Sequence, residues 1–581
     1  MPNIFLTESW QQRHTNDVRS RAGNRYSPQF HVDLPIARLF SGLSRDVEFY
    51  REIRERFGAL ARKTARLSWC ENIPEFSKSV GSLRKQANSL LNVLNAIKEF
   101  SNDLIDWTEI GQYSKLSIQA TRAVLELSWT LELEQKSKPN LERNGTDFNR
   151  LRHELYEGEK ELRFLAKESE TSWAKASNIR ALLLTGSAGT GKTHLLCDVV
   201  EARSKRRKPS LLVFGESFTE GMPLLEQIAS QLHFGEYGLS GANIPSLLDE
   251  AGSEAGERSL LMIDALNETP SLSYWKRELP QLMEILVDYP HTALVVSVRD
   301  GFEAEVIPAS CMHSFVKESH PGFEFREWEA ASKFFGEFGI PVPDIPLLMP
   351  EFRTPLFLLL FCKGIQSRIR KNIKSGKRKQ VFRGHEGATY IFENFIKASA
   401  DRVAKEFGLK PGRDHQGRYV IWDTVIEPMA ARISSNRLHL DRIQGKTLRA
   451  IIAQAHPSVD ADELALALER NYLVTKIPNY RRGIRNGYAF RFPYQKFSDH
   501  LIVRYLLKNT SLKRAGLLRK FRKAEKFGKI ISMPWRYRGL IEALAVQIPE
   551  RFDGTELPDL VPWARTDQTV RDALPQSRSF R

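Results

Sequence analysis

Residues 186–193 form the glycine-rich segment that most constrains how this chain can fold. The segment reads Gly-Ser-Ala-Gly-Thr-Gly-Lys-Thr and directly follows the apolar run 181–184. Glycines at Gly186 and Gly191 let the backbone adopt dihedrals that other residues resist and allow it to approach a phosphate chain closely. The spacing G-x-x-x-x-G-K-[ST] between a strand and a helix predicts a phosphate-binding loop at the edge of a parallel α/β sheet.

Phosphate chemistry assigns a role to each part of this loop. Amides at the start of the following helix point at the anion, and the helix dipole favours negative charge there. Lys192 reaches the β- and γ-phosphates, and the hydroxyl of Thr193 binds Mg²⁺. The expected nucleotide ligands are the loop and the residue after it: Gly186, Ser187, Ala188, Gly189, Thr190, Gly191, Lys192, Thr193 and His194.

A second apolar run, residues 260–263, ends in Asp264. Such a run suits a parallel strand that is covered on both faces. Because ligands of open α/β sheets bind at the carboxyl ends of strands, we expect Asp264 to hold Mg²⁺ through water. Glu268 lies four residues further on and is the candidate that polarises the attacking water. The alternative for Glu268 is a solvated loop carboxylate.

A third apolar run, residues 292–296, leads into Ser297 and Arg299. An arginine at the carboxyl end of a strand would face the γ-phosphate, and an ordinary surface ion pair is the alternative for Arg299. Strands and helices alternate over residues 177–322, which predicts a P-loop NTPase core: a parallel sheet with helices on both faces and right-handed crossovers.

The run that ends in residues 264–268 (Asp-Ala-Leu-Asn-Glu), followed by Ser-Val-Arg at 297–299, resembles the signal-transducing STAND ATPases, in particular their NACHT-like branch. That branch usually has a second acidic residue just before the glutamate. Asn267 stands there in this chain, a departure expected to alter Mg²⁺ binding or slow turnover. Residues 24–28, 31–36 and 210–215 resemble the corresponding stretches of prokaryotic Avs (AVAST) antiphage proteins.

Two further segments carry this resemblance. Residues 354–362 resemble the proline motif of the small helical domain after the NACHT core, which implies that Pro355 packs near the adenine ring. By composition alone, the segment is a buried helix with proline in its first turn. Residues 488–507 resemble the end of the winged-helix domain, where many NACHT receptors place a histidine on the β-phosphate. Arg491 occupies that position, and an arginine can act as a bidentate phosphate clamp.

Composition excludes several classes of protein. No run of about 18 apolar residues occurs, so no membrane span is expected, and a basic-then-apolar leader is absent from the first residues. The cysteines are scattered, which indicates thiols in a reducing cytoplasm and neither disulfides nor a zinc site. They are Cys70, Cys197, Cys311 and Cys362.

Positive charge exceeds negative charge by 16, and much of the excess is local. One cluster spans residues 363–383 and a second spans residues 513–529. Solvated loop and helix faces are the ordinary explanation for such clusters. Binding of nucleic acid, or of an acidic protein partner, is the alternative.

The patterns along the chain divide its 581 residues into six segments. Apolar stripes at three- and four-residue steps favour a packed helical bundle in the second of them. The expected segments are an irregular N-terminal segment (1–43), a helical N-terminal region (44–170), the P-loop NTPase, NACHT-like domain (177–322), a small helical domain (323–385), a winged-helix domain (386–510) and the start of a C-terminal helical region (511–581), with a proline-punctuated tail from Pro549.

The family resemblance implies a cytoplasmic switch that binds ATP or ADP with Mg²⁺. At rest ADP would be clamped between the core and the winged helix. A foreign, phage-derived protein would loosen that clamp, and the ATP form would assemble with copies of itself and activate an effector in antiviral defence. Slow ATP hydrolysis would use Lys192, Asp264, Glu268 and Arg299. The alternatives are an ATP-modulated DNA-binding regulator that uses the winged helix and basic clusters, and an AAA-type, DNA-stimulated ATPase.

Overall fold

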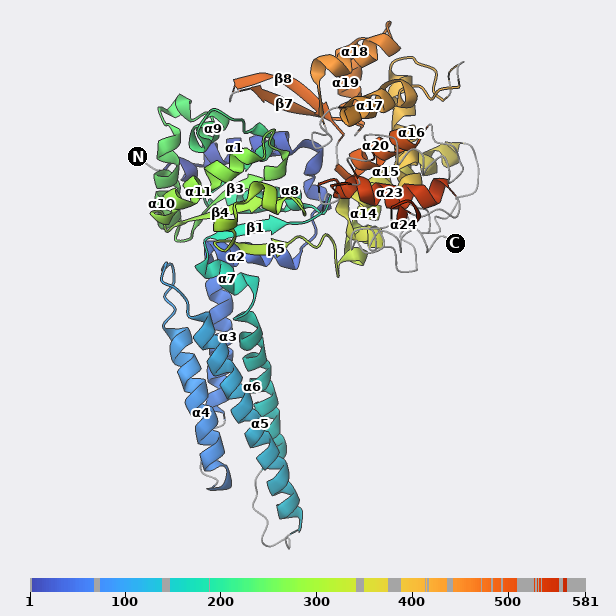
Figure 1. Cartoon of the computed structure of the whole chain (residues 1–581). Helices are drawn as coiled ribbons and strands as arrows, with labels where there is room; N and C mark the ends of the chain where they lie inside the picture. Colours follow the sequence, from blue (N-terminus) through green and yellow to red (C-terminus); the bar gives the residue numbers. More distant parts are fainter. Residues whose placement is uncertain are drawn as a thin grey trace.

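The computed structural model describes the chain in three spatial parts: an α/β core, a helical stalk and a C-terminal assembly (Figure 1). The description covers residues 3–66, 74–137, 147–187, 189–340, 350–374, 388–412, 414, 417–435, 442–471, 473–481, 484–492, 495–508, 527, 530, 532–533, 536–552 and 557–561. Ala188 and Cys70 of the expected residues, and the charged residues of the second basic cluster, lie outside these ranges.

The core is built on a five-stranded parallel sheet in the order β2-β3-β4-β1-β5. Its strands are β1 (Ala181–Thr185), β2 (Ser210–Phe214), β3 (Ser259–Asp264), β4 (Thr292–Ser297) and β5 (Val316–Ser319). Every residue of β1 to β4 is buried, as expected for strands that are covered on both faces. The sequence prediction of a P-loop NTPase core is confirmed.

Helices cover both faces of this sheet. They include α8 (Lys192–Lys205), α9 (Leu224–Gln231), α10 (Ile244–Ala255), α11 (Ser273–Val287), α12 (Glu303–Val306) and α13 (Ala309–Met312). Alternate residues of β1 enter different apolar clusters: Leu182 and Leu184 join one, and Leu183 joins the other. The sheet therefore separates two hydrophobic cores and holds the ends of β1, β3 and β4 at one edge.

The N-terminal segment differs from the sequence prediction, because it contains α1 (Glu8–Ala22) and begins α2 (Arg38–Ser44). The expectation of an irregular segment was wrong for these residues. Trp10 and Val18 of α1 are buried, and the amide of Leu212 in β2 donates to His14 Nε2 at 3.1 Å. Tertiary packing against the core thus fixes a helix whose polar composition concealed it.

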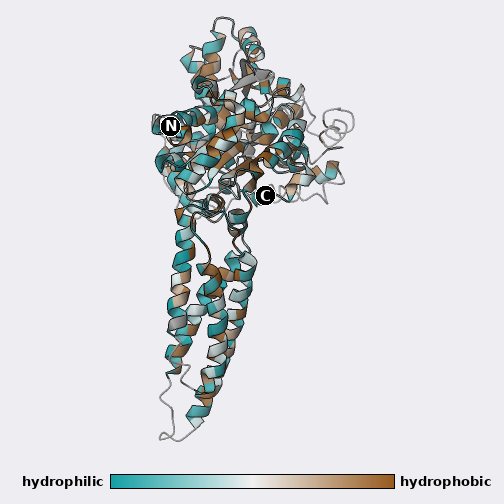
Figure 2. Cartoon of the chain, turned by 90° about the vertical axis from the view of Figure 1, so that its left-hand side faces the viewer, coloured by the Kyte–Doolittle hydropathy of each residue, from teal (hydrophilic) through white to brown (hydrophobic). Residues whose placement is uncertain are grey.

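Four long helices form a stalk that extends away from the core (Figure 1). They are α3 (Val47–Ala65), α4 (Pro74–Asn95), α5 (Trp107–Ser137) and α6 (Phe148–Glu168), and the short α7 (Ser172–Asn178) leads back into β1. Hydrophilic and hydrophobic residues alternate along these helices (Figure 2). The expected stripes are buried at Leu83, Leu90, Leu151 and Leu162, so the predicted bundle is confirmed.

The C-terminal assembly contains a three-stranded antiparallel sheet in the order β6-β8-β7, surrounded by helices. The strands are β6 (Arg442–Gln444), β7 (Thr475–Arg481) and β8 (Ile484–Arg491). The helices are α14 (Glu327–Phe338), α15 (Pro355–Lys374), α16 (Ala388–Glu406), α17 (Glu427–Ser435), α18 (Gly445–Ala455), α19 (Ala461–Arg470), α20 (Gln495–Leu507), α23 (Arg538–Arg551) and α24 (Leu557–Leu560). The three strands and the helices α16 to α20 fall in the segment expected to form the winged-helix domain (386–510), and they are here called the winged-helix unit.

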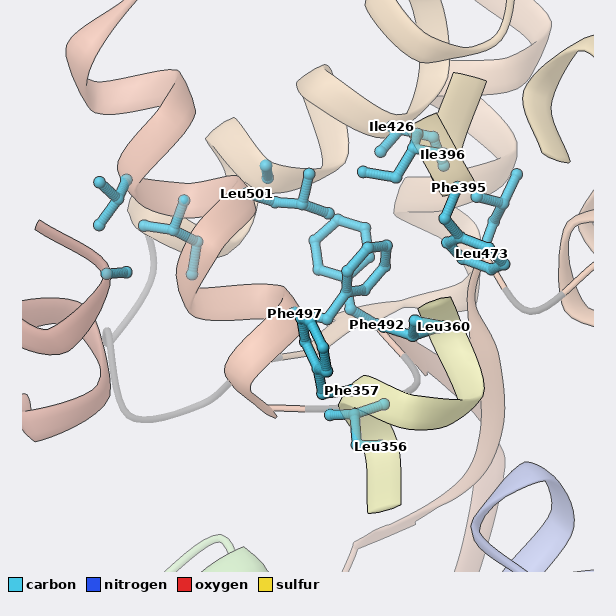
Figure 3. Packing of buried hydrophobic residues seen from close by; sticks show 14 of the residues in the cluster. Leu356, Phe357, Leu360, Phe395, Ile396, Ile426, Leu473, Phe492, Phe497 and Leu501 are labelled. Atoms are coloured by element: carbon cyan, nitrogen blue, oxygen red, sulfur yellow. The ribbon is translucent and has the colours of Figure 1, made fainter. Parts of the chain in front are cut away.

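One apolar cluster joins the winged-helix unit to the helices before it (Figure 3). The Phe497 ring of α20 lies 6.0 Å from that of Phe395 in α16 and 5.9 Å from that of Phe492. Phe357 of α15 belongs to the same cluster. A displacement of the winged-helix unit would therefore have to displace α15 with it or disturb the packing of this cluster.

The expected tail from Pro549 is also different in the structure, since Pro549 lies inside α23. Leu540, Leu544 and Ile548 of this helix are buried in the cluster shared with α20, and this packing offsets the loss of one backbone donor at the proline. None of the helices within the described ranges is long and apolar enough to span a membrane.

We expect Leu151→Ala to destabilise the stalk by about 2–5 kcal/mol, because it leaves a cavity in a fully buried site. Leu133→Ala is the matched control on the same stalk, where the side chain is 68% exposed, and should cost less than about 0.5 kcal/mol. Hydrogen exchange of α4, α5 and α6 measures the difference. Equal protection in both variants would contradict the bundle packing.

Candidate nucleotide-binding site

The loop between β1 and α8 has a backbone that requires glycine. The φ angles of Gly186, Gly189 and Gly191 are +149°, +81° and +107°, a region that side chains with a Cβ rarely adopt. Lys192 Nζ donates to the backbone oxygens of Gly186 at 2.6 Å and Ser187 at 3.0 Å. Burial lowers the pKa of Lys192 to about 8. A buried cation held by carbonyl dipoles fits a site for an anion such as a phosphate chain.

Oxygen ligands gather where β3 and β4 end. Thr193 Oγ1 donates to Asp264 Oδ2 at 2.6 Å, and Ser297 Oγ donates to Asp264 Oδ1 at 2.5 Å. The amide of Ala265 donates to Ser297 Oγ at 2.7 Å. A hydroxyl beside a buried carboxylate is a donor set that suits Mg²⁺, so Thr193 and Asp264 fit the metal that the sequence implies.

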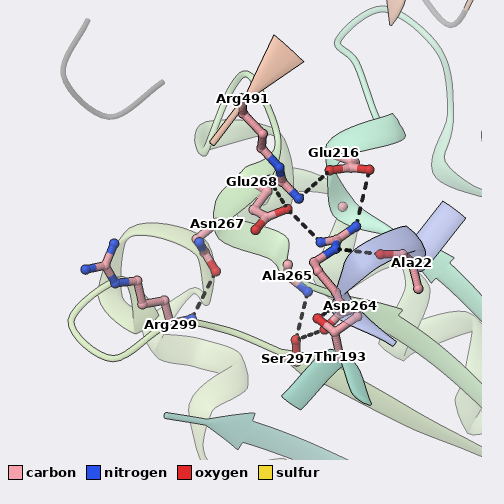
Figure 4. Close-up of polar contacts among 12 residues, drawn as sticks. Ala22, Thr193, Glu216, Asp264, Ala265, Asn267, Glu268, Ser297, Arg299 and Arg491 are labelled. Atoms are coloured by element: carbon pink, nitrogen blue, oxygen red, sulfur yellow. Dashed lines mark hydrogen bonds and ion pairs between the residues drawn. The ribbon is translucent and has the colours of Figure 1, made fainter. Parts of the chain in front are cut away.

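Glu268 lies in a closed ring of charges, here called the ionic ring, with Arg25, Arg491 and Glu216 (Figure 4). Glu268 Oε2 accepts from Arg491 Nη1 at 2.7 Å and from Arg25 Nη1 at 3.2 Å. The same arginines reach Glu216, Arg491 at 3.2 Å and Arg25 at 3.5 Å. Burial by itself raises the pKa of Glu268, but Arg491 and Arg25 outweigh it and lower the pKa to about 2.

Arg299 follows β4 and is held from two sides. Its amide donates to Asn267 Oδ1 at 2.9 Å, and its guanidinium Nη2 lies 3.4 Å from Asp499 Oδ2 in α20. The side chain lines the same cavity as Lys192. In this conformation the Arg299 guanidinium therefore contacts the winged-helix unit.

A cavity of about 160 Å³ connects these groups and is lined by two chemically different sets of residues. Lys192, Glu268 and the arginines form the charged set. The apolar set includes Phe30, whose ring stacks on Phe334 with centroids 4.4 Å apart. Pro355, Leu356 and Leu359 of α15 belong to the apolar set as well. Charged groups beside flat apolar side chains fit a nucleotide, whose phosphates suit the first set and whose base suits the second.

The N-terminal segment forms part of the wall of this cavity, a contact that the sequence did not predict. His194 Nδ1 lies 2.9 Å from Asp198, and its Nε2 lies 3.1 Å from the Ser27 carbonyl. His194 thus holds the segment as well as lining the cavity. Arg25 and Glu216 were missed as site residues. Arg25 falls in the stretch that carried the Avs resemblance, whereas no local pattern marks Glu216.

Comparisons with known proteins add little detail. No model of a protein family matches the chain, and no curated protein matches it. Among solved structures it is similar to Cdc6p from Pyrobaculum aerophilum (15% identity, covering 56% of this chain and 87% of that one). Others are the replication initiator DnaA bound to AMPPCP and single-stranded DNA (15%, 50% and 81%) and Orc1 of Aeropyrum pernix in complex with DNA (13%, 57% and 86%).

All three similarities have a TM-score of 0.23 and carry no conclusion about activity. The class of protein follows from the chain itself. The sheet order, the glycine loop after β1 and the buried aspartate at the end of β3 define a P-loop NTPase with a winged-helix unit.

We expect Lys192→Ala to lower the affinity for Mg²⁺–ATP by about 100-fold, because the phosphates lose a buried cation that donates charge-assisted hydrogen bonds. Calorimetry measures the affinity, and thermal unfolding of both proteins controls for folding. Unchanged affinity would mean that the loop does not bind the phosphates.

A second prediction concerns how the N-terminal segment docks at different pH. Hydrogen bonding to Asp198 at 2.8 Å, together with Asp33 at 2.9 Å, outweighs burial and raises the pKa of His31 from 6.5 to about 9. The protonated histidine therefore stabilises docking fully below pH 6.5, and this contribution is lost as pH rises through about 9. Hydrogen exchange of residues 24–36, corrected for intrinsic rates, should increase across that window. His31→Gln should remove the pH dependence, and its persistence would contradict the assignment.

Proposed function

We propose that this chain is a STAND-type ATPase switch, in which ATP or ADP with Mg²⁺ controls docking of the winged-helix unit on the core. The contact of Arg491 in β8 with Glu268 in the core, at 2.7 Å, carries the proposal. Glu268 is the residue best placed by sequence to polarise the attacking water. The residue expected to promote hydrolysis is therefore also the residue that holds the two units together.

Two groups expected to act on the γ-phosphate are engaged by the winged-helix unit in this conformation. Arg491 neutralises Glu268, and Asp499 pairs with Arg299. A carboxylate with its pKa near 2 is a weak base, so hydrolysis should be slow until the winged-helix unit moves. We therefore interpret the conformation as the resting form.

In the active form each residue has a separate task. Lys192 and the loop amides bind the phosphates, while Thr193 and Asp264 hold Mg²⁺, which supplies charge neutralisation. Glu268 orients water, and Arg299 stabilises charge on the γ-phosphate. A ligand shifts the equilibrium only if it binds the two forms unequally, and the ring beside the phosphate-binding residues is where such a difference can arise.

The biological role we propose rests on the resemblance to Avs proteins in residues 24–28, 31–36 and 210–215. A phage protein would favour the undocked form, copies of the chain would assemble in the ATP state, and an effector would then act in antiviral defence. Part of the resembling N-terminal stretch lines the cavity, since Asn24, Arg25 and Ser27 all contact it. This placement supports a functional role for that stretch.

DNA binding is the second candidate, favoured by the net charge of +16. The helix α19 precedes the β7–β8 hairpin, and its exposed residues include Asp462 and Glu463. These acidic side chains disfavour insertion of α19 into a groove of DNA. Carboxylates repel the phosphates of DNA. A DNA-binding winged helix would use this helix for most of its contacts with base edges. Lys363, the first residue of one basic cluster, has a pKa lowered to about 6 by burial, so it adds little charge at neutral pH.

We expect Arg491→Glu to undock the winged-helix unit, because it places a third carboxylate beside Glu216 and Glu268. Small-angle scattering should show a larger radius of gyration than for the wild type. Adding Glu216→Arg should restore compactness, since opposite charges face each other again. Arg470→Glu is the matched control, because exposed Arg470 in α19 pairs with Glu406 and not with the core. This variant should have the radius of gyration of the wild type. A wild-type radius for Arg491→Glu would contradict the switch.

A further inference from the structure

We propose that Arg25 is the residue that distinguishes ATP from ADP, and that Glu216 is the counter-ion that sets how strongly it does so. This inference rests on the proposed function, because it concerns the same nucleotide site. Neither residue belongs to the glycine loop or to the strand ends that carry the rest of the site.

Arg25 is anchored to the core and not to the winged-helix unit. It ends the short turn Gly23–Arg25 after α1, and the next residue, Tyr26, donates to Asp198 at 3.0 Å and Glu201 at 2.7 Å in α8. Its guanidinium lies 5.4 Å from the centre of the Phe214 ring at the end of β2. Arg25 therefore stays beside the cavity whether or not the winged-helix unit is docked.

Arg25 lines the cavity among its charged residues. It lines the same space as Lys192 and Thr193, and its guanidinium donates to Glu268 at 3.2 Å. With the base against the apolar residues and the phosphates along the glycine loop, the terminal phosphate falls nearest to this group of residues. ADP lacks the charge that would reach Arg25, and ATP supplies it.

Arg25 is also the arginine of the ionic ring that can change partner at the lower cost. Its contacts to Glu268 and Glu216 are 3.2 and 3.5 Å, whereas those of Arg491 are 2.7 and 3.2 Å. If Arg25 turns to a phosphate, each carboxylate keeps its contact with Arg491. No buried carboxylate is then left without a counter-charge, which would otherwise cost several kcal/mol.

The change of partner by Arg25 also alters the surroundings of Glu268, the residue expected to act as general base. Arg25 leaving Glu268 removes one of the two guanidiniums that lower its pKa, so a triphosphate weakens the restraint on Glu268 while a diphosphate does not. Glu216 competes with the phosphate for Arg25, since its carboxylate is almost fully buried and accepts from Arg25. Removing the charge of Glu216 should therefore favour the triphosphate.

Calorimetry with the full chain, Mg²⁺ and either ADP or the non-hydrolysable AMPPNP tests this inference. We expect Arg25→Lys to weaken AMPPNP binding by at least tenfold and ADP binding by less than twofold, because lysine cannot bridge two acceptors as a guanidinium does. We expect Glu216→Gln to act in the opposite direction, with AMPPNP binding at least threefold tighter. Arg21→Lys, a neighbour that contacts Gln231 outside the cavity, is the matched control.

The outcomes separate this inference from the proposed function. Wild-type protein that binds neither nucleotide would overturn both. Wild-type binding with equal losses of ADP and AMPPNP affinity in Arg25→Lys would overturn only the role of Arg25, since a structural role affects both ligands alike. Weaker AMPPNP binding in Glu216→Gln would overturn the competition between the carboxylate and the phosphate.

Discussion

The ionic ring is the interaction on which the arrangement of the described parts depends. It joins the turn after α1, the end of β2, the loop after β3 and the end of β8. Glu216 and Arg491 are almost entirely buried, and an unpaired charge in such a place is costly. Because two carboxylates share two guanidiniums, loss of one member changes the environment of the other three. The ring thus couples the four segments that supply its members.

The glycine loop is coupled to the same arrangement from its other side. The amide of Leu356 at the start of α15 donates to the Gly189 carbonyl at 3.4 Å, and a Cβ on Gly189 would lie 2.8 Å from the Leu356 side chain. Since α15 packs in the cluster that contains Phe497 of the winged-helix unit, a change in the loop reaches that unit through apolar contacts as well. Charge and packing therefore both connect the glycine loop to the winged-helix unit.

Local pattern was enough to predict which candidate residues lie at the end of a strand or in the turn that follows it. The glycine loop, Asp264 at the end of β3 and Arg299 after β4 belong to this group, because each is defined by a few consecutive residues. The ring was not predictable in this way. Its contacts join positions 243 and 223 residues apart, and Glu216 follows β2 without any pattern that separates it from a solvated carboxylate.

The prediction of secondary structure was wrong in two segments for a related reason. The helix α1 is polar in composition, and only the packing of Trp10 and Val18 against the core makes it stable. The helix α23 contains Pro549, although proline by its local preference ends or kinks a helix. In both cases contacts distant in sequence outweigh a local preference, and these are the contacts that hold the N-terminal segment and the C-terminal helices in place.

Charge balance also accounts for Asn267, the position at which this chain differs from the NACHT-like pattern that its sequence resembles. Asn267 lines the cavity next to Glu268, and its side-chain oxygen accepts from the Arg299 amide at 2.9 Å. An aspartate or glutamate there would place a third carboxylate close to a ring that has two positive groups for two negative ones. The additional carboxylate would share the same two guanidiniums and leave the buried Glu216 less well compensated. A neutral side chain that still accepts the Arg299 amide keeps the turn in place without that cost, so the departure at Asn267 and the presence of both arginines are consistent with a single electrostatic requirement.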